Sequence, residues 1–340
     1  MRPDPTPHLL IPFAACSAEA WLPTMAALPP DGLKHLGPLL QGMRLVQTDL
    51  QASESLSPPH ERALARALGL ADGATPDGLL PWAASEALAL MLDSSRGKAW
   101  AWITPCHWAM GHLHATLSDP ALLQLQPDES KALLALMQPY FDTDGLTLHV
   151  VEPGRWLAEG ELLRGLPTAA LDRVLARNVD AWLPSAQRAA PLRRLQNEMQ
   201  MLLYTHPFND GREARRQVPV NSFWISGTGD LPAGFGAAFA PALSQGQRLK
   251  EGEEDQVSVP RSLAQAVFRE DWSGYAKAWA ELDVGEIAGL LARQQTGEAV
   301  RLTLCGEGSA QTFETHRAGL WRKFSSIFSP FRTLDMLKQL

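Results

Sequence analysis

The chain has 340 residues and a formal net charge of -7, and its composition is 45% hydrophobic and 20% charged. This length suffices for one large domain or two ordinary ones. The composition is that of a globular protein, because it is too apolar for a disordered one. With this negative charge a general affinity for nucleic acid is not expected, although a local basic patch is allowed.

The cysteines and the apolar runs indicate the compartment. Cys16, Cys106 and Cys305 are far apart and odd in number, which argues against a disulfide framework or a zinc site and suits a reducing compartment. The first residues combine an acidic side chain and several prolines with a short apolar run, which makes a poor signal peptide. No apolar run reaches the ~18 residues that a membrane span needs. We therefore expect a cytoplasmic protein without a membrane partner.

The first half of the sequence predicts short strands among helices. The apolar run 8–14, bounded by prolines, predicts a buried first strand, and the alternating run 99–103 predicts a half-buried one. Residues 28–57 are rich in Pro, Gly, Gln and Ser and predict only weak helical pieces. Capping residues and apolar spacing predict helices at 17–27, 57–69, 83–92, 128–141 and 168–179. A turn between 146–152 and 155–158 predicts a hairpin.

The second half centres on residues 191–229. An amphipathic helix at 191–204 leads into a polar loop at 205–217, and then into a short aromatic strand that ends in a glycine-rich turn. The polar segment 243–259 predicts a linker or a mobile loop. Beyond it, the sequence predicts helices at 261–271, 272–282, 284–295 and 318–340, with a hairpin around Glu307 and Gly308 between the last two.

This alternation of helices and strands favours an α/β or α+β fold with a mixed central sheet flanked by helices. The hairpin and the helical segment near the C-terminus interrupt a simple βαβ rhythm. We expect a main domain over 1–242, the linker 243–259, and a C-terminal segment 260–340 that packs on the same core.

The helix 191–204 has two faces of different character. One is apolar and predicted to be buried, and comprises Leu192, Leu195, Met199, Leu202 and Leu203. The other contains no lysine and comprises Arg193, Asn197, Gln200 and Tyr204, while Arg194 and Glu198 can pair beside it. Amide, guanidinium and phenol groups make directional contacts. The sequence leaves two interpretations open, a ligand-facing surface and a buried structural network.

The loop and the strand that follow add further candidate ligand-binding residues. His206, Asn209 and Arg212, with two more arginines close by, could bind a phosphate or carboxylate, although Asn-Asp-Gly is also ordinary turn chemistry. Ligands of open α/β sheets bind beyond the carboxyl ends of strands, where this sequence offers small polar side chains. These are Asn221, Ser222, Ser226 and Thr228. The turn matches neither a dinucleotide-binding loop nor a nucleophile elbow.

A metal or cofactor is not predicted. Cys106, His107, His112 and His114 lie close together in sequence, but their spacing matches no ligand motif. Cys106 is therefore predicted to be structural, since a Cys–His nucleophilic pair must meet in space and adjacent residues usually point apart.

Several segments resemble a known family. They read LLIPFA, PPHERALARALGL, WAWITPCHW, LRRLQNEMQMLLYTHPFNDGRE, VNSFWISGTG and VRLTLCGE. They are similar to a group of uncharacterised proteobacterial proteins labelled cofactor-independent phosphoglycerate mutase-like, or regulatory protein of the RpfE type. The pattern of Asn221, Ser222, Trp224, Gly227 and Gly229 resembles a segment of archaeal-type phosphoglycerate mutases. The resemblance implies a degenerate relative of the alkaline phosphatase and phosphoglycerate mutase fold.

Enzymes of that superfamily use two metal ions, held by Asp and His, and a Ser or Thr nucleophile near the first strand. Here the first strand is followed by AACSAEAW, which offers no Asp. We therefore expect a protein that binds a small polar or phosphorylated ligand, or a protein partner, in a regulatory role. A diverged phosphoryl-transfer enzyme, a mutase or phosphatase, is the alternative. The oligomeric state stays open.

Overall fold

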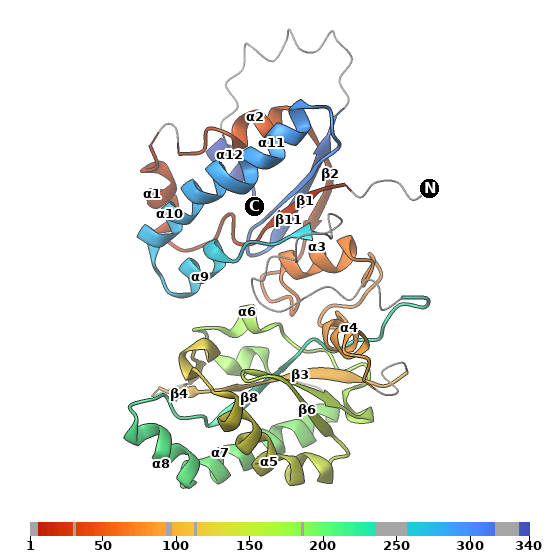
Figure 1. Cartoon of the computed structure of the whole chain (residues 1–340), viewed down its shortest axis with the longest axis vertical. Helices are drawn as coiled ribbons and strands as arrows, with labels where there is room; N and C mark the ends of the chain where they lie inside the picture. Colours follow the sequence, from red (N-terminus) through yellow and green to blue (C-terminus); the bar gives the residue numbers. More distant parts are fainter. Residues whose placement is uncertain are drawn as a thin grey trace. The chain divides into compact units, whose positions relative to one another are not determined.

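The computed structural model describes residues 6–29, 32–92, 97–111, 114–184, 187–235, 257–316 and 333–340. The chain forms two compact units (Figure 1). Unit 1 comprises 1–53, 59–67 and 244–340, and unit 2 comprises 54–58 and 68–243. Most of the predicted linker 243–259 and the first part of the predicted helix 318–340 lie outside the described residues. The predicted division into 1–242, 243–259 and 260–340 stays a prediction.

Unit 1 contains a mixed five-stranded sheet in the order β2-β11-β10-β1-β9. Its strands are β1 His8–Ile11, β2 Met43–Leu50, β9 Val257–Ser258, β10 Arg301–Cys305 and β11 Ser309–Thr315. Strand β1 pairs in parallel with both β9 and β10, and the hairpin of β10 and β11 continues antiparallel to β2. The mixed sheet and the hairpin around Glu307 confirm the predicted fold class.

One face of this sheet carries the larger core of unit 1. The helices of this unit are α1 Trp21–Ala26, α2 Leu36–Gln41, α3 Pro59–Ala67, α9 Ser262–Phe268, α10 Trp272–Leu282, α11 Ala288–Gln295 and α12 Thr333–Leu337. A π-helical turn, Asp283–Ile287, joins α10 to α11. Its buried Asp283 accepts hydrogen bonds from the backbone N–H groups of His35 and Leu36, and so satisfies donors at the start of α2.

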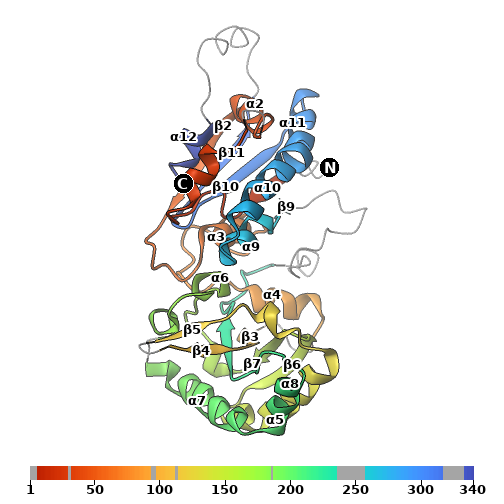
Figure 2. The ribbon, with the colours of Figure 1, turned by 90° about the vertical axis from the view of Figure 1, so that its left-hand side faces the viewer.

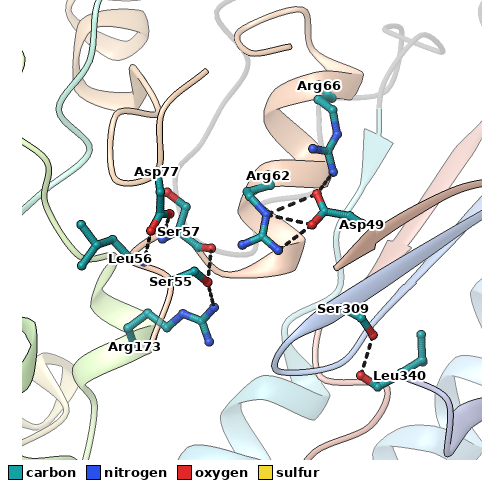
Figure 3. A network of polar contacts seen from close by, with 10 residues as sticks. All are labelled: Asp49, Ser55, Leu56, Ser57, Arg62, Arg66, Asp77, Arg173, Ser309 and Leu340. Carbon is teal, nitrogen blue, oxygen red and sulfur yellow. Dashed lines mark hydrogen bonds and ion pairs between the residues drawn. The ribbon is translucent and has the colours of Figure 1, made fainter. Parts of the chain in front are cut away.

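Helix α3 packs on the opposite face of the sheet, through Ala63 against Leu10, Cys305 and Ala310. Asp49 of β2 fixes this helix by accepting hydrogen bonds from Arg62 and Arg66 (Figure 3). The Nη2 of Arg62 lies 2.6 Å from Oδ1 of Asp49. Two guanidinium groups on one largely buried carboxylate lower the pKa of Asp49 despite the opposing effect of burial, so the carboxylate stays charged.

Strand β2 corrects the sequence prediction, which placed only weak helical pieces in 28–57. The strand lies at one edge of the sheet, and Leu45, Val46 and Leu50 are exposed. A bulge interrupts its pairing with β11 between Thr312 and Phe313. An exposed edge strand with a bulge does not show the alternation of apolar and polar residues that identifies a half-buried strand.

Unit 2 is built on an antiparallel four-stranded sheet in the order β6-β7-β3-β8. Its strands are β3 Trp100–Cys106, β6 Thr147–Glu152, β7 Arg155–Glu159 and β8 Ser222–Ser226, and β4 Trp108–Met110 pairs with β5 Ala115–Leu117 in a separate ribbon. Helices α5 Pro127–Thr143 and α7 Ala190–Tyr204 cover one face (Figure 2). Helix α4 Trp82–Ala89 packs on the other face, against Trp100 and Leu157.

Two local predictions in unit 2 are wrong. The segment 205–217, predicted as a loop, contains helix α8 Pro207–Ala214. Pro207 ends α7 as predicted, but it also suits the first turn of a new helix, and His206 caps that helix by accepting from the N–H of Phe208. The predicted helix 168–179 is reduced to α6 Leu171–Val174, followed by a 3-10 turn at Val179–Trp182. Further 3-10 turns lie at Pro120–Leu123, Glu161–Leu163 and Gln187–Ala189.

A buried histidine in unit 1 makes stability depend on pH. The Nε2 of His8 lies 2.8 Å from Oγ1 of Thr303, and burial, assisted by the charge of Arg301, lowers the pKa of His8 from 6.5 to about 3. Below about pH 6.5 the unfolded chain therefore binds a proton that the folded chain does not. The contribution of His8 to the free energy of unfolding is complete above this pH and falls by about 1.4 kcal/mol per pH unit toward pH 3.

We expect His8→Gln to remove this part of the pH dependence. Urea unfolding at pH 7, 6 and 5 measures it as the difference in slope between the wild type and the variant. Other titrating groups are common to both proteins and cancel in the comparison. Equal slopes would show that His8 binds its proton as readily in the folded protein as in the unfolded chain.

Candidate ligand-binding pocket

The polar face of α7 lies on the surface of unit 2. Asn197 and Tyr204 are exposed, and Gln200 is half-buried. Arg194 donates a hydrogen bond to Asp144 over 2.6 Å and pairs with Glu198 at 3.5 Å, as predicted. Because these side chains border solvent, they form no buried network, and their role as ligand-binding residues stays a prediction.

Asn209 and Arg212 hold α8 in place. The Nδ2 of Asn209 donates to the carbonyls of Leu203 and Val220 over 2.9 and 2.7 Å, and its Oδ1 accepts from the N–H of Val220. The side chain of Arg212 is fully buried. Its Nη1 lies 2.9 Å from Glu129, its Nε donates to the carbonyl of Val218, and its Nη2 donates to that of Leu123. These contacts join α8 to its neighbours.

Two polar side chains that flank β8, Asn221 and Thr228, also find partners inside the protein. The amide of Asn221 accepts from the N–H of Trp108 over 2.7 Å and donates to its carbonyl over 2.9 Å. Ser222 and Ser226 are buried. The hydroxyl of Thr228 is fully buried, lies 2.9 Å from that of Thr168 and donates to the carbonyl of Leu166 over 2.6 Å.

The predicted site residues thus divide between the two ends of β8. His206, Asn209 and Arg212 lie near its amino end, where Asn209 bonds to Val220. Ser226 and Thr228 lie at its carboxyl end. A strand of five residues spans roughly 17 Å, so the two groups cannot contact one small ligand together. The structure therefore places these predicted residues in two separate groups, and their role in ligand binding stays a prediction.

The glycines of the turn after β8 make room for the protein's own chain. Gly227 and Gly229 have φ angles of +71° and +145°. A Cβ on Gly227 would lie 2.9 Å from Cε3 of Trp102, and one on Gly229 would lie 2.3 Å from the carbonyl oxygen of Leu79. Glycine is therefore required by close packing inside unit 2. The chain then leaves this packed region at Asp230 and turns again over 232–235.

A pocket of about 320 Å³ opens where the chain emerges. It is lined by Ala84, Gly97, Lys98, Arg164, Asp230, Leu231, Pro232, Ala233 and Gly234. Two cationic side chains and one carboxylate therefore share it with apolar walls. The pocket lies beyond the carboxyl end of β8, which is where the sequence predicted a ligand, although its charged residues are different ones.

Arg164 connects the segments around the pocket. Its Nε and Nη2 donate to the carboxylate of Glu161 over 2.6 and 3.0 Å, its Nη2 donates to the carbonyl of Gly97 over 2.8 Å, and its Nη1 lies 3.2 Å from Oδ1 of Asp230. These interactions, chiefly with Glu161, raise the pKa of Arg164, which is charged in any case. The ammonium group of Lys98 pairs with Glu159. Both cationic groups of the pocket are therefore held in place by carboxylates.

Sequence reasoning did not find Lys98, Arg164 or Asp230. Asp230 and Gly97 lie 66 and 67 residues from Arg164, and no local pattern shows that these positions meet. The available signals were the two turns, SSRGK and SGTGD, each with glycine beside a charged residue.

The structure also places the residues considered for metal binding. His107 bonds through Nδ1 to the carbonyl of Pro219 over 2.9 Å, and Cys106 is fully buried in an environment that raises its pKa. His112 lies outside the described residues. Within the described ranges, no three His, Cys, Asp or Glu side chains are grouped closely enough to hold a metal ion. In the same part of the chain, no helix is long and apolar enough to cross a membrane.

Comparisons with known proteins give distant structural matches. No protein-family model and no curated protein matches the sequence. The PH0037 protein from Pyrococcus horikoshii is 13% identical, with a TM-score of 0.41 over 92% of this chain and 88% of that one. A cofactor-independent phosphoglycerate mutase from Thermoplasma acidophilum is 14% identical, with a TM-score of 0.35 over 98% of each chain.

Proposed function

We propose that this protein binds a small phosphorylated ligand in the pocket beyond β8. The observation that carries the proposal is that Lys98 and Arg164 both line a cavity of about 320 Å³, a size suited to a small molecule. Guanidinium and ammonium groups are the usual protein partners of phosphate oxygens. The walls formed by Ala84, Leu231 and Pro232 suit an apolar part of the same ligand.

The carboxylate of Asp230 supports this proposal, because it occupies the position that a phosphate group of the ligand would take. Its Oδ1 occupies a position 3.2 Å from Nη1 of Arg164, where an anionic oxygen of a ligand would also lie. Asp230 is largely exposed, so its ion pair with Arg164 is worth little and is easily replaced. Glu161 binds Arg164 from the other side through two hydrogen bonds and keeps the guanidinium in place.

Titration calorimetry with inorganic phosphate and with phenyl phosphate tests the site. We expect Arg164→Gln to weaken binding about tenfold or more, because it removes a charge-assisted contact. Asp230→Asn removes the competing carboxylate and should strengthen binding several-fold. Arg216→Gln, at the end of α8, is the matched control and should bind as the wild type does.

The same titrations test the residues predicted from the sequence. If Asn197→Ala, Gln200→Ala or Tyr204→Ala abolishes phosphate binding while Arg164→Gln does not, the ligand binds on α7 and the pocket is not the site. If none of these variants changes binding, both proposals fail. The regulatory role is the part of the proposal that rests on the sequence resemblance alone.

A diverged phosphoryl-transfer enzyme would use the same class of ligand and is the second candidate. It is distinguished by stoichiometric Mn or Zn in the purified protein and by hydrolysis of a generic aryl phosphate when these ions are added. Binding of phenyl phosphate without hydrolysis under these conditions would favour a binding protein. A protein partner, the remaining possibility from the sequence, concerns the surface of α7.

A further inference from the structure

We propose that the protein self-associates through the exposed face of α7, which packs antiparallel against α7 of a second copy. This face comprises Arg193, Asn197, Gln200, Met201 and Tyr204. Tyr204 is 85% exposed and Met201 78%, although both are large side chains with much apolar surface. Tyr, Met and Arg are the residue types enriched in protein interfaces, and lysine, which is depleted there, is absent from this face.

The spacing of four of these side chains along the helix is the same from both ends. Asn197 is four positions after Arg193, Gln200 three positions after Asn197, and Tyr204 four positions after Gln200. A twofold axis between positions 198 and 199 therefore places Arg193 opposite Tyr204 of the second copy. It also places Asn197 opposite Gln200 of the second copy. A twofold interface requires this kind of self-complementary surface.

Each of these opposed pairs is chemically matched. A guanidinium over a phenol ring is a favourable cation–π contact, and two side-chain amides can each donate and accept one hydrogen bond. Each pair occurs twice in the dimer because of the symmetry. This match between the two ends of the face favours a second copy over an unrelated partner.

Two further contacts prepare the face for packing. Arg193 donates from Nε and Nη2 to the carbonyl of Pro184 over 3.2 and 2.7 Å, so its guanidinium is already held before association. Less side-chain entropy is then lost on binding. Glu198 lies nearest the twofold axis but to one side of the face, where Arg194 of the same helix pairs with it at 3.5 Å. The like charges of the two copies are thus compensated within each chain.

An interface formed by one pair of helices buries less than the roughly 1,200 Å² of accessible surface that a stable specific interface buries. Association is therefore weak and depends on concentration. Sedimentation equilibrium of the full chain over a wide concentration range should show a monomer–dimer equilibrium. We expect Tyr204→Ala and Arg193→Ala each to raise the dissociation constant about tenfold, because each substitution removes two symmetry-related contacts. Arg216→Ala, at an exposed position just after α8, should leave it unchanged.

Cross-linking tests the antiparallel register. A mixture of the Asn197→Cys and Gln200→Cys variants should form a mixed disulfide under mild oxidation, whereas a mixture of Arg216→Cys with either should not. Background from native thiols is low, because Cys106 and Cys305 are buried and burial raises the pKa of Cys16 to about 11. A monomer at every concentration would overturn the proposal. So would a dimer that survives Tyr204→Ala and yields no cross-link between the two variants.

Discussion

Replacing Arg212 by methionine is expected to lower the free energy of unfolding by about 3–5 kcal/mol, as is usual when one partner of a buried ion pair is removed. The substitution keeps an apolar stem of similar length but deletes every donor. It leaves the carbonyls of Leu123 and Val218 without the hydrogen bonds that Arg212 now donates, and leaves Glu129 without its buried partner. Urea unfolding measured at pH 7 gives the difference.

Arg215→Met is the matched control for this prediction. Arg215 also pairs with Glu129, but its side chain is 54% exposed. An exposed ion pair contributes about 1 kcal/mol or less, so this variant should remain nearly as stable as the wild type. If Arg212 serves a ligand instead, Arg212→Met will reduce binding while its unfolding curve stays close to that of the wild type.

Gly229→Ala is the second substitution with a large expected effect, a loss of about 3–5 kcal/mol. Two causes act together. The φ angle of +145° disfavours any residue with a Cβ, and that Cβ would lie 2.3 Å from the carbonyl oxygen of Leu79. The obstacle is backbone, so a change of side-chain rotamer cannot relieve the clash. Thermal unfolding of the variant should show a single large decrease in Tm.

Gly234→Ala separates these two causes, since it lies in the same segment at a φ of +81° with no atom within 4 Å of the added Cβ. Gly234→Ala should lower the free energy of unfolding by only about 1 kcal/mol, because alanine disfavours a positive φ angle. Equal losses in the two variants would mean that the clash at Leu79 is relieved at little cost, and that the turn is loosely packed.

The sequence predicts correctly those helices and strands whose pattern lies within a few consecutive residues. Helix α7 follows from its sequence, because the spacing of Leu192, Leu195, Met199 and Leu203 specifies one buried side, and the structure confirms it. The hairpin of β10 and β11 follows likewise from two apolar runs around a Glu-Gly turn. Helix α8 was missed because Asn-Asp-Gly favours turns, whereas burial of Asn209 and Arg212 outweighs that preference.

The pocket illustrates what sequence reasoning cannot reach. The glycine-rich turn after β8 was correctly placed, but its glycines suggested a ligand where the structure shows packing against Trp102 and Leu79. The charged groups of the pocket come from loops at Lys98 and Arg164, which only the antiparallel sheet brings beside Asp230. Contacts between such distant positions are set by topology, and no periodic pattern encodes them.

The way unit 1 is assembled has a consequence for synthesis of the chain. Strand β1 begins at His8, yet its sheet partners are β9 at Val257 and β10 at Arg301. A nascent chain emerging from the ribosome therefore holds an apolar strand β1 without a neighbour until β9 and β10 have been made. Unit 2, whose residues end at 243, can complete its core earlier. Interrupted translation would accordingly release a folded second unit with an unpaired, aggregation-prone strand at its amino end.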